Sequence, residues 1–346
     1  MKKCKKIILM FGIICVVLGF VDIKVLAKTN AQRTIGSNTE AVQIGNVIYY
    51  VCNTTADGTS GIRAYNIRTH KNTAITKNIR VFSKIENLTY VNGYLYYITY
   101  VVDDYPYYEV ARINIKTNKK EVVHREISNY FINNNKIYYL NNMESPGRIT
   151  LYQSSLNGKR KRKIASFYMK GNYIYESFIS DGIIYYSTKF ISDNREKYYA
   201  ISVDKFKQKS ISKKSFFKQY NTTKIYTSNK KNYYTRILVK DKSFMSRENN
   251  YRNAYSAYVI KDNVYYTDDW YRIIKKKTSS GEKCVLKKYK NHHSYGNETT
   301  TIIPVGNFFI IKHFFKDSKN YKYTWTLVKT NGQKVKKLYE LEKYKS

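Results

Sequence analysis

The sequence predicts an all-β fold made of small, repeated antiparallel sheets. Three observations lead to this fold class: a phrase with paired tyrosines returns at regular intervals, polar and apolar residues alternate after each copy, and helical periodicity is almost absent. The chain has 346 residues, of which 42% are hydrophobic and 38 are tyrosine, so it can bury a substantial core and is unlike a disordered polymer.

An export signal precedes this fold. The basic stretch MKKCKK is followed by fifteen apolar residues, Ile7–Val21, and VLA at Val25–Ala27 offers small residues for cleavage. A membrane-spanning helix needs about 20 apolar residues, so we expect a signal peptide over residues 1–27, with an uncleaved membrane anchor as the alternative. Cleavage removes five lysines and one aspartate, which lowers the net charge by four, from +37 to +33.

Two cysteines remain beyond that segment, Cys52 and Cys284. A single pair of cysteines does not make a disulfide framework. Sequence spacing alone does not bring two thiols within bonding distance. We expect two separate buried thiols, with a bridge between them as the alternative.

A phrase with two tyrosines recurs along the chain. NNNKIYYLNN at Asn133–Asn142 is one copy, and IGNVIYYV, VNGYLYYI, SDGIIYYS and KDNVYYTD are others. Degenerate copies are KNYYT, with Asn232 before the tyrosines, and GNFFII, with phenylalanines in their place. Successive copies are 42 to 48 residues apart, with one interval of 32. Such spacing is typical of one blade of a β-propeller.

A second phrase follows each copy and supplies two more strands. In VARINIKTNKKEVV (Val110–Val123) and TLYQSSLNGKRKRKI (Thr150–Ile164), apolar residues alternate with polar ones on both sides of a short turn. Asn-Gly between two such runs is a strong signal for a β-hairpin. Two hairpins in each unit give four strands, so we expect a β-propeller over residues 44–346, with residues 28–43 as a linker or a closing strand.

The number of blades depends on one irregular region. Residues Lys224–Asn253 contain a tyrosine pair but a shortened second phrase, so they form either a degraded blade or an insertion between two blades. We therefore expect six or seven four-stranded blades, and the number of tyrosine-pair copies favours seven. No helix is expected beyond the signal segment.

The tyrosine pairs have a structural explanation. Asn, Asp and Gly before each pair accept the positive φ that a tight turn requires. Successive residues of a strand point to opposite faces, so one ring of each pair would enter one inter-blade layer and the other ring could fill the opposite layer or present its hydroxyl to water. Tyrosine has a large apolar body and a polar tip, which suits a half-buried position. We expect the pairs to be packing residues and not ligand platforms.

The pairing of NNKIYYLN with LYQSSLNGKRKRKI resembles a family of exported, tyrosine-rich bacterial β-propellers of unknown function. In repeat style it is also similar to the propellers of low-density-lipoprotein-receptor-related proteins. Similar phrases run from about Ile44 to Leu338. The resemblance implies a binding or scaffolding propeller at or beyond the cell surface, and it supplies no catalytic residues. The Tyr-Trp-Thr-Asp strand of the receptor propellers survives only in fragments, YYSTKF and YYTDDW, so a receptor-type ligand does not carry over.

Candidate catalytic and metal-binding residues are few. Adjacent histidines on a strand point apart, so His292-His293 lacks the spacing of a zinc site. The acidic pairs Asp103-Asp104 and Asp268-Asp269 have no calcium-loop pattern around them. No Gly-x-Ser-x-Gly, P-loop or Gly-x-Gly-x-x-Gly motif is present. We expect no cofactor, no metal and no enzymatic activity. An extracytoplasmic lyase or hydrolase acting on an acidic glycan is the alternative. The remaining histidines are His70, His124 and His313.

Basic runs are the remaining functional signal. Lys and Arg total 62 against 25 Asp and Glu, and such a surplus creates a long-range positive potential. Solvated hairpins that only add solubility are the alternative explanation. The candidate polyanion-binding residues are Lys159, Arg160, Lys161, Arg162 and Lys163 after one hairpin turn, and Lys275, Lys276 and Lys277 in a second phrase.

These features together predict an exported, non-enzymatic binding module. We expect it outside the cytoplasm, secreted or attached to the surface of a Gram-positive-type bacterium. Its partner would be a surface protein or an anionic cell-envelope polymer, and specific nucleic-acid binding is not expected. Attraction to a polyanion should weaken as salt screens it over about 8–10 Å. Only an uncleaved signal segment would give membrane contact, and the sequence predicts no oligomeric state.

Overall fold

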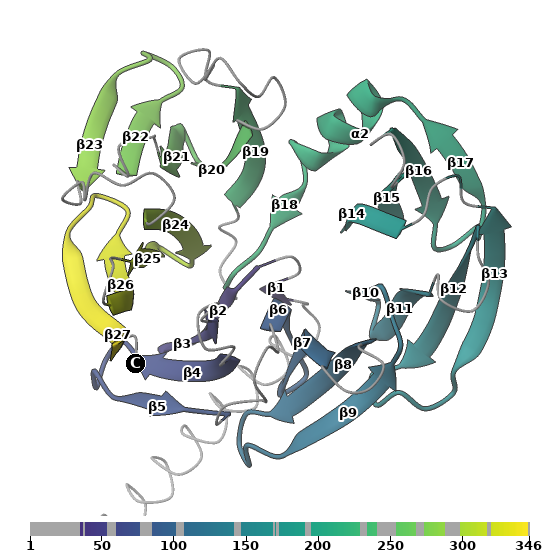
Figure 1. Cartoon of the computed structure of the whole chain (residues 1–346), viewed down its shortest axis with the longest axis horizontal. Helices are drawn as coiled ribbons and strands as arrows, with labels where there is room; N and C mark the ends of the chain where they lie inside the picture. Colours follow the sequence, from purple (N-terminus) through teal and green to yellow (C-terminus); the bar gives the residue numbers. More distant parts are fainter. Residues whose placement is uncertain are drawn as a thin grey trace, which may run out of the picture.

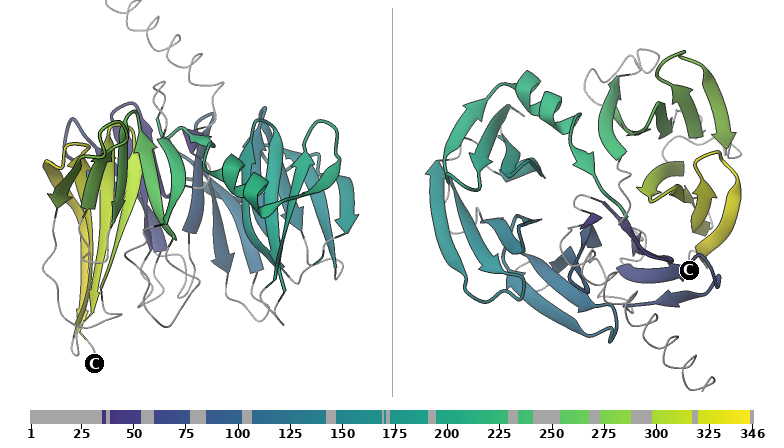
Figure 2. Two further views of the ribbon diagram at one scale, coloured as in Figure 1. Left: turned by 90° about the horizontal axis from the view of Figure 1, so that it is seen from above. Right: turned by 180° about the vertical axis from the view of Figure 1, so that it is seen from behind.

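Six antiparallel sheets are arranged in a ring (Figure 1), and their strands run roughly along the axis of that ring when it is seen from the side (Figure 2). The predicted β-propeller is confirmed, with six blades and not the seven that the copy count favoured. The computed structural model describes residues 35–36, 39–53, 60–76, 85–101, 107–141, 147–168, 170, 173–190, 195–228, 234–240, 254–267, 273–287, 298–316 and 320–344.

Each blade is built from four strands that are consecutive in the chain. Blade 1 consists of β2 (Ala41–Ile44), β3 (Val47–Asn53), β4 (Ser60–Asn66) and β5 (Asn72–Ala74). Blade 2 consists of β6 (Ile85–Val91), β7 (Tyr94–Val101), β8 (Tyr107–Asn114) and β9 (Lys120–Arg125). Blade 3 consists of β10 (Asn129–Asn133), β11 (Lys136–Asn141), β12 (Arg148–Ser155) and β13 (Arg162–Tyr168).

The second half of the ring repeats this order. Blade 4 consists of β14 (Tyr173–Ser180), β15 (Ile183–Lys189), β16 (Glu196–Ser202) and β17 (Gln208–Ile211). Blade 5 consists of β20 (Ala254–Ile260), β21 (Asn263–Thr267), β22 (Ile273–Lys277) and β23 (Lys283–Lys287). Blade 6 consists of β24 (Glu298–Val305), β25 (Phe308–Lys316), β26 (Asn320–Lys329) and β27 (Lys334–Tyr344).

Three further strands extend two of these sheets. β1 (Ile35–Gly36) pairs with β6 of blade 2. β18 (Lys224–Ile225) pairs with β19 (Tyr234–Lys240), which in turn pairs with β20 of blade 5. The degenerate KNYYT copy therefore ends in an added strand of blade 5, which explains why counting copies overestimated the blades.

Most rings of the tyrosine pairs fill the layers between blades, as predicted, whereas Tyr185 packs against the helix that follows blade 4 and Tyr266 packs within blade 5. In blade 3, Tyr138 packs in a cluster with Ile184 of blade 4, whereas Tyr139 packs in a cluster with Tyr96 of blade 2. The two rings of each pair lie in different core clusters, and in blade 6 the register places Ile310 and Ile311 at the positions of the pair. The pairs are Tyr49 and Tyr50, Tyr96 and Tyr97, Tyr138 and Tyr139, Tyr185 and Tyr186, and Tyr265 and Tyr266.

One short helix, α2 (Lys213–Tyr220), follows blade 4. The hydroxyl of its N-cap residue Ser212 accepts a hydrogen bond from the backbone N–H of Ser215 at 3.1 Å. Phe216 is buried and lies 5.2 Å, ring centre to ring centre, from Phe178 of β14. The helix thus covers the side of blade 4 that faces blade 5, where the sequence predicted no helix (Figure 1).

The residues after this helix, which we call the crossing segment (Lys224–Ser228), run across the middle of the ring toward β2 (Figure 1). The backbone N–H of Gln43 in β2 donates to the carbonyl of Thr227 at 2.6 Å. The hydroxyl of Thr227 accepts from the N–H of Gly306, in the β24–β25 turn, at 2.9 Å. This segment therefore links the chain after blade 4 to both blade 1 and blade 6.

Side chains close the ring between blades 1 and 6, because their strands form two separate sheets. We call this interface the closing seam. Tyr50 of β3 and Trp325 of β26 are fully buried in its core cluster. Asn72 of β5 donates to the carbonyl of Leu338 in β27, and Arg63 lies 4.6 Å from the centre of the Tyr339 ring.

The two described cysteines are free thiols. Cys52 is buried in β3, and burial raises the pKa of its thiol well above the usual range. Cys284 lies in β23 and is exposed, so the prediction of two separate thiols is confirmed but the prediction that both are buried is wrong. Among the described residues, no helix has the length and apolar character to cross a membrane. The predicted signal peptide lies outside them.

Candidate functional site

Two sets of turns lie at the same end of the propeller. We call the turns between first and second strands of each blade the inner turns, and those between third and fourth strands the outer turns. Because consecutive strands are antiparallel, both sets share one end, the turn face. Hydrogen bonds join them: the N–H of Ile115 donates to the carbonyl of Gly93 at 3.0 Å, and Val203 donates to Gly182 at 3.0 Å.

The outer turns carry most of the sequence-predicted basic residues and several that the sequence analysis did not single out. Acidic residues in the same turns are Glu121, Asp204 and Glu282. Basic residues in or beside the outer turns are Arg68 and Lys71 in blade 1, Lys116, Lys119 and Lys120 in blade 2, Lys159 to Lys163 in blade 3, Lys205, Lys207 and Lys209 in blade 4, Lys275 to Lys277 and Lys283 in blade 5, and Lys329, Lys334, Lys336 and Lys337 in blade 6.

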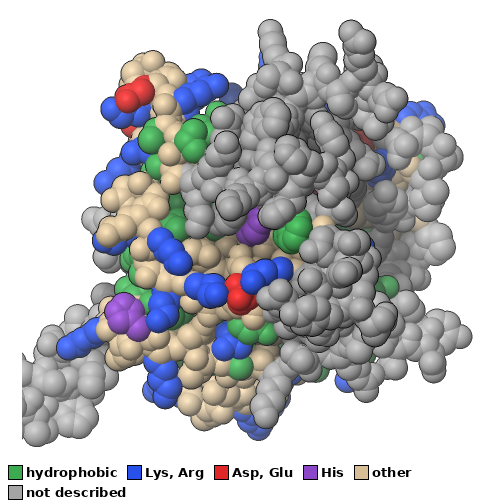
Figure 3. All heavy atoms as spheres, turned by 60° about the vertical axis from the view of Figure 1, so that its left-hand side comes forward, with side chains coloured by type: hydrophobic (Ala, Val, Ile, Leu, Met, Phe, Trp, Pro, Cys, Tyr) green, Lys and Arg blue, Asp and Glu red, His purple; other side chains and the backbone are tan. Residues whose placement is uncertain are grey.

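The two predicted basic runs are not brought together. Lys159–Lys163 belongs to the outer turn of blade 3, and Lys275–Lys277 ends strand β22 of blade 5. In blade 5, Lys277 forms an ion pair with Glu282 at 3.2 Å. Figure 3 brings the side of blades 5, 6 and 1 forward and shows Lys and Arg spread over the described surface with few acidic side chains among them. The runs therefore occupy separate positions on one common face.

Within the blade 3 run, the side chains differ in what they contact. The Lys161 ammonium lies 4.6 Å from the centre of the Tyr152 ring, which stacks on Tyr139 at 5.1 Å. Arg162 donates through Nε to Gln153 Oε1 at 2.9 Å. Lys159, Arg160 and Lys163 are exposed and form no ion pair with a described residue. All five side chains are exposed, and these three have no described side-chain partner.

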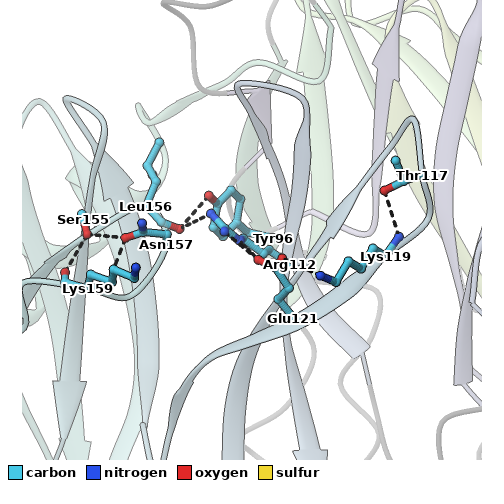
Figure 4. Close-up of polar contacts among 9 residues, drawn as sticks. All are labelled: Tyr96, Arg112, Thr117, Lys119, Glu121, Ser155, Leu156, Asn157 and Lys159. Carbon is cyan, nitrogen blue, oxygen red and sulfur yellow. Dashed lines mark hydrogen bonds and ion pairs between the residues drawn. The ribbon is translucent and has the colours of Figure 1, made fainter.

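Blade 2 holds this turn in place (Figure 4). The carbonyl of Leu156 accepts two hydrogen bonds, from Tyr96 Oη at 2.8 Å and from Arg112 Nη1 at 3.1 Å. Arg112 also donates to Glu121 Oε2 through Nε at 2.9 Å and Nη2 at 2.6 Å. This ion pair lowers the pKa of Glu121 below its usual value. The contact brings the outer turns of blades 2 and 3 side by side, which repeat spacing alone does not predict.

Glycine makes the fit of this turn close. Gly158 has φ +79°, and a β-carbon there would lie 2.7 Å from the carbonyl oxygen of Val123 in β9. A β-carbon on Gly332, in the outer turn of blade 6, would likewise lie 3.1 Å from the carbonyl oxygen of Leu286 in blade 5. Both glycines come from the Asn-Gly pairs that predicted hairpins. They also allow each turn to pack on the outer strand of the preceding blade.

The described histidines lie in three different blades. His70 hydrogen-bonds with Tyr65 Oη at 2.8 Å in blade 1, and His313 of blade 6 hydrogen-bonds with Thr300 at 2.9 Å. His124 of blade 2 is buried, and its Nε2 lies 2.7 Å from Ser154 Oγ. Burial, with a smaller contribution from the charge of Lys161, lowers the pKa of His124 to about 4.

Three other candidate groups for catalysis or metal binding lie outside the described residues. His292-His293 and the acidic pairs Asp103-Asp104 and Asp268-Asp269 lie beyond the described residues. Among the residues that the structure does describe, no group of three or more His, Cys, Asp or Glu side chains could hold a metal ion.

Comparisons with known proteins add the following. No protein-family model and no curated protein sequence matches the chain, so the resemblance to an exported propeller family stays a prediction. The β-propeller domain of the Trilobed protease from Pyrococcus furiosus aligns with 88% of this chain and 96% of its own, at 12% identity and a TM-score of 0.46. TolB from Acinetobacter baumannii aligns with 84% of this chain at 9% identity and a TM-score of 0.39, and this chain spans 62% of it. Likeness at this level does not indicate a ligand or an activity.

Proposed function

We propose that this propeller is an exported binding module that holds an anionic cell-envelope polymer on its turn face. The outer turn of blade 3 is the observation that carries the proposal. Lys159, Arg160 and Lys163 are exposed there without an ion pair to a described residue, on a turn that Arg112 and Tyr96 fix to blade 2. A rigid turn with uncompensated positive charge attracts a polyanion and loses little entropy when it binds.

Binding, and not catalysis, is the role we propose. The described histidines are in separate blades, and the buried His124 is closed in by Tyr139 and Ser154. The crossing segment forms a parallel β-bridge with Gln43 of β2, so this segment lies in the middle of the ring, where a catalytic site shared by several blades would be expected (Figure 1). These features favour a ligand held on the turn face. The export signal of residues 1–27 supports a location outside the cytoplasm.

The test is binding of fluorescein-labelled heparin to the exported protein, followed by anisotropy. The triple variant Lys159→Gln, Arg160→Gln, Lys163→Gln should bind about tenfold more weakly at low salt, and raising salt from about 50 to about 300 mM should weaken binding of the unmodified protein by at least as much. Unchanged affinity at the higher salt would refute an electrostatic site.

A matched control removes the same charges from the other end of the strands. Arg148 begins β12, Lys170 follows β13, and Lys197 lies at the start of β16, all away from the turn face. All three side chains are exposed. The triple variant Arg148→Gln, Lys170→Gln, Lys197→Gln should change affinity by less than about threefold. It lowers the long-range positive potential but removes no charge from the turn face. Equal losses in the two triple variants would show that net charge, and not the turn face, governs binding.

A further inference from the structure

The outer turns of three consecutive blades each carry exposed basic residues. We define the basic arc as the exposed Lys and Arg in or beside the outer turns of blades 2, 3 and 4 whose charged groups have no described ion pair closer than 4.0 Å, no aromatic contact and no side-chain hydrogen bond. We infer that the ligand is an extended linear polyanion that lies along this arc and contacts several turns at once, and that it is not a small anion held at one turn. This inference rests on the proposed function. The residues of the arc are Lys116, Lys119, Lys159, Arg160, Lys163, Lys205, Lys207 and Lys209.

Direct contact makes the arc continuous between blades 2 and 3. Arg112 of blade 2 binds the Leu156 carbonyl in the outer turn of blade 3 (Figure 4). Gly158 of that turn also packs against Val123 of β9. Lys119 leaves the blade 2 turn with its side chain 75% exposed and lies 4.0 Å from Glu121, at the limit of an ion pair. The charges of the two turns therefore belong to one surface.

Blade 4 adds its own outer-turn lysines to the arc, and the described contact between blades 3 and 4 on the turn face joins their inner turns. Gly182 and Asn133, in the inner turns of blades 4 and 3, lie close enough that a β-carbon on Gly182 would be 3.9 Å from Asn133 Nδ2. Beyond blade 4, helix α2 interrupts the row of outer strands, as Figure 1 shows. In blades 5 and 6, Lys277 and Lys337 are neutralised by Glu282 and Glu340 at 3.2 and 3.1 Å. Lys329, Lys334 and Lys336 of blade 6 are also exposed and form no ion pair with a described residue. Helix α2, and not a loss of charge farther round the ring, therefore bounds the arc on this side (Figure 1).

No single turn of the arc forms a site for a small anion. In blade 3, Lys161 and Arg162 are turned toward Tyr152 and Gln153, and the remaining charges of that turn are exposed. An isolated exposed charge contributes little to binding. Several weak contacts on one rigid surface add up when one ligand spans them, because each contact after the first is intramolecular. The arrangement therefore favours a ligand with repeated anionic groups.

Ligand length is the variable that tests this inference. The probes are tripolyphosphate, long-chain polyphosphate, and short and long heparin oligosaccharides, with affinity expressed per anionic group at low salt. We expect the long chain of each polymer to bind at least tenfold more tightly than the short one. Length dependence in either polymer supports the inference, and the steeper dependence shows whether phosphate or sulfated-glycan chemistry fits better.

Variants at the two ends of the arc sharpen the test. Lys116→Gln with Lys119→Gln in blade 2, and Lys205→Gln with Lys207→Gln in blade 4, should each weaken long-chain binding about three- to tenfold and leave tripolyphosphate binding unchanged. If long and short chains bind equally per anionic group, the inference is wrong while the proposed function stands. If no polyanion binds even at low salt, the proposed function fails and the inference fails with it.

Discussion

Gly158 occupies a place that no other residue fits without strain. Its φ of +79° lies where L side chains are rare, and a β-carbon would come within 2.7 Å of the Val123 carbonyl oxygen and 3.1 Å of Val123 Cγ1. Gly93 has a similar φ of +84°, but nothing lies within 4 Å of its β-carbon position. A side chain at Gly93 would therefore cause backbone strain alone, whereas a side chain at Gly158 would cause both backbone strain and crowding.

Replacing them should give different losses of stability. Gly158→Ala should lower the free energy of unfolding by about 2–3 kcal/mol, since it adds crowding to the strain of positive φ, whereas Gly93→Ala should lower it by about 1 kcal/mol. Urea denaturation of both variants measures this. Equal losses would show that the contact between the blade 3 turn and β9 does not stabilise the chain.

His124 is a buried base that stays neutral in the folded protein. Its pKa is lowered to about 4 by burial and by Lys161, against about 6.5 for an unfolded histidine. Between these pH values the unfolded chain binds a proton that the folded chain does not bind. Stability must therefore fall as the pH is lowered through this range.

The expected loss from this one residue is roughly 2–3 kcal/mol between pH 6.5 and 4, with no further loss below pH 4. Denaturation at a series of pH values gives the free energy of unfolding against pH for the unmodified protein and for His124→Gln. The difference between the slopes of the two curves measures the contribution of His124. Parallel curves for the two proteins would contradict the assignment of this pH dependence to His124.

Strands and hairpins carry most of what the sequence predicts correctly. The polar turns before the tyrosine pairs of blades 1 to 4 contain Asn or Gly with positive φ, such as Asn134 at 48° and Gly93 at 84°, and this local chemistry is visible in the sequence. In blade 5 the residue with positive φ is Lys261, at 53°, which the sequence does not indicate. The crossing segment and helix α2 were not predicted, because their partners, Gln43 for Thr227 and Phe178 for Phe216, are distant in the chain.

The same reason limits prediction of the candidate site. The basic runs that begin at Lys159 and Lys275 are visible in the sequence. Their positions in two separate blades, 3 and 5, depend on how the sheets are arranged in the ring. The neighbouring charge of Lys116 and Lys119 is also visible in the sequence, within the phrase NIKTNKKE. Nothing in that phrase shows that Arg112 would bind the turn of the next blade.

The crossing segment should contribute measurably to stability through one hydroxyl. Thr227 is buried, and its Oγ1 accepts the N–H of Gly306 at 2.9 Å. Thr227→Val keeps the shape but leaves that N–H without its partner, so the free energy of unfolding should fall by about 1–2 kcal/mol. Thermal and chemical denaturation measure the loss. Thr227→Ser, which keeps the hydroxyl, should lose less, and the reverse order would contradict the role of this hydrogen bond.

The complete ring depends on a seam that no described strand crosses. Tyr50, Trp325 and Leu327 are fully buried in this seam between blades 1 and 6. Every other pair of neighbouring blades is consecutive in the chain, with α2, β18 and β19 between blades 4 and 5. Among the described residues, the first and last blades meet through side chains and the crossing segment. Loss of packing at this interface should therefore open the ring locally.

Trp325→Ala should lower the free energy of unfolding by about 3–5 kcal/mol. It should also raise hydrogen exchange in β2–β5 and β24–β27 before other strands, because these two blades border the cavity that the missing indole ring leaves. Phe131→Ala, between blades 3 and 4, is the matched control and should raise exchange in β10–β17. The same exchange pattern in both variants would show that the ring opens as one unit and that the seam has no special weakness.

The sheets of blades 1, 3, 4 and 6 each consist of four consecutive strands from one stretch of the chain, and no sheet in the described structure is completed by strands from both ends. An in-frame duplication or deletion of such a stretch in the gene would add or remove an entire sheet without dividing a hairpin. Recombination between repeats would then need only a new side-chain interface to re-form. Propellers of other sizes are accessible from this coding sequence in a single genetic event.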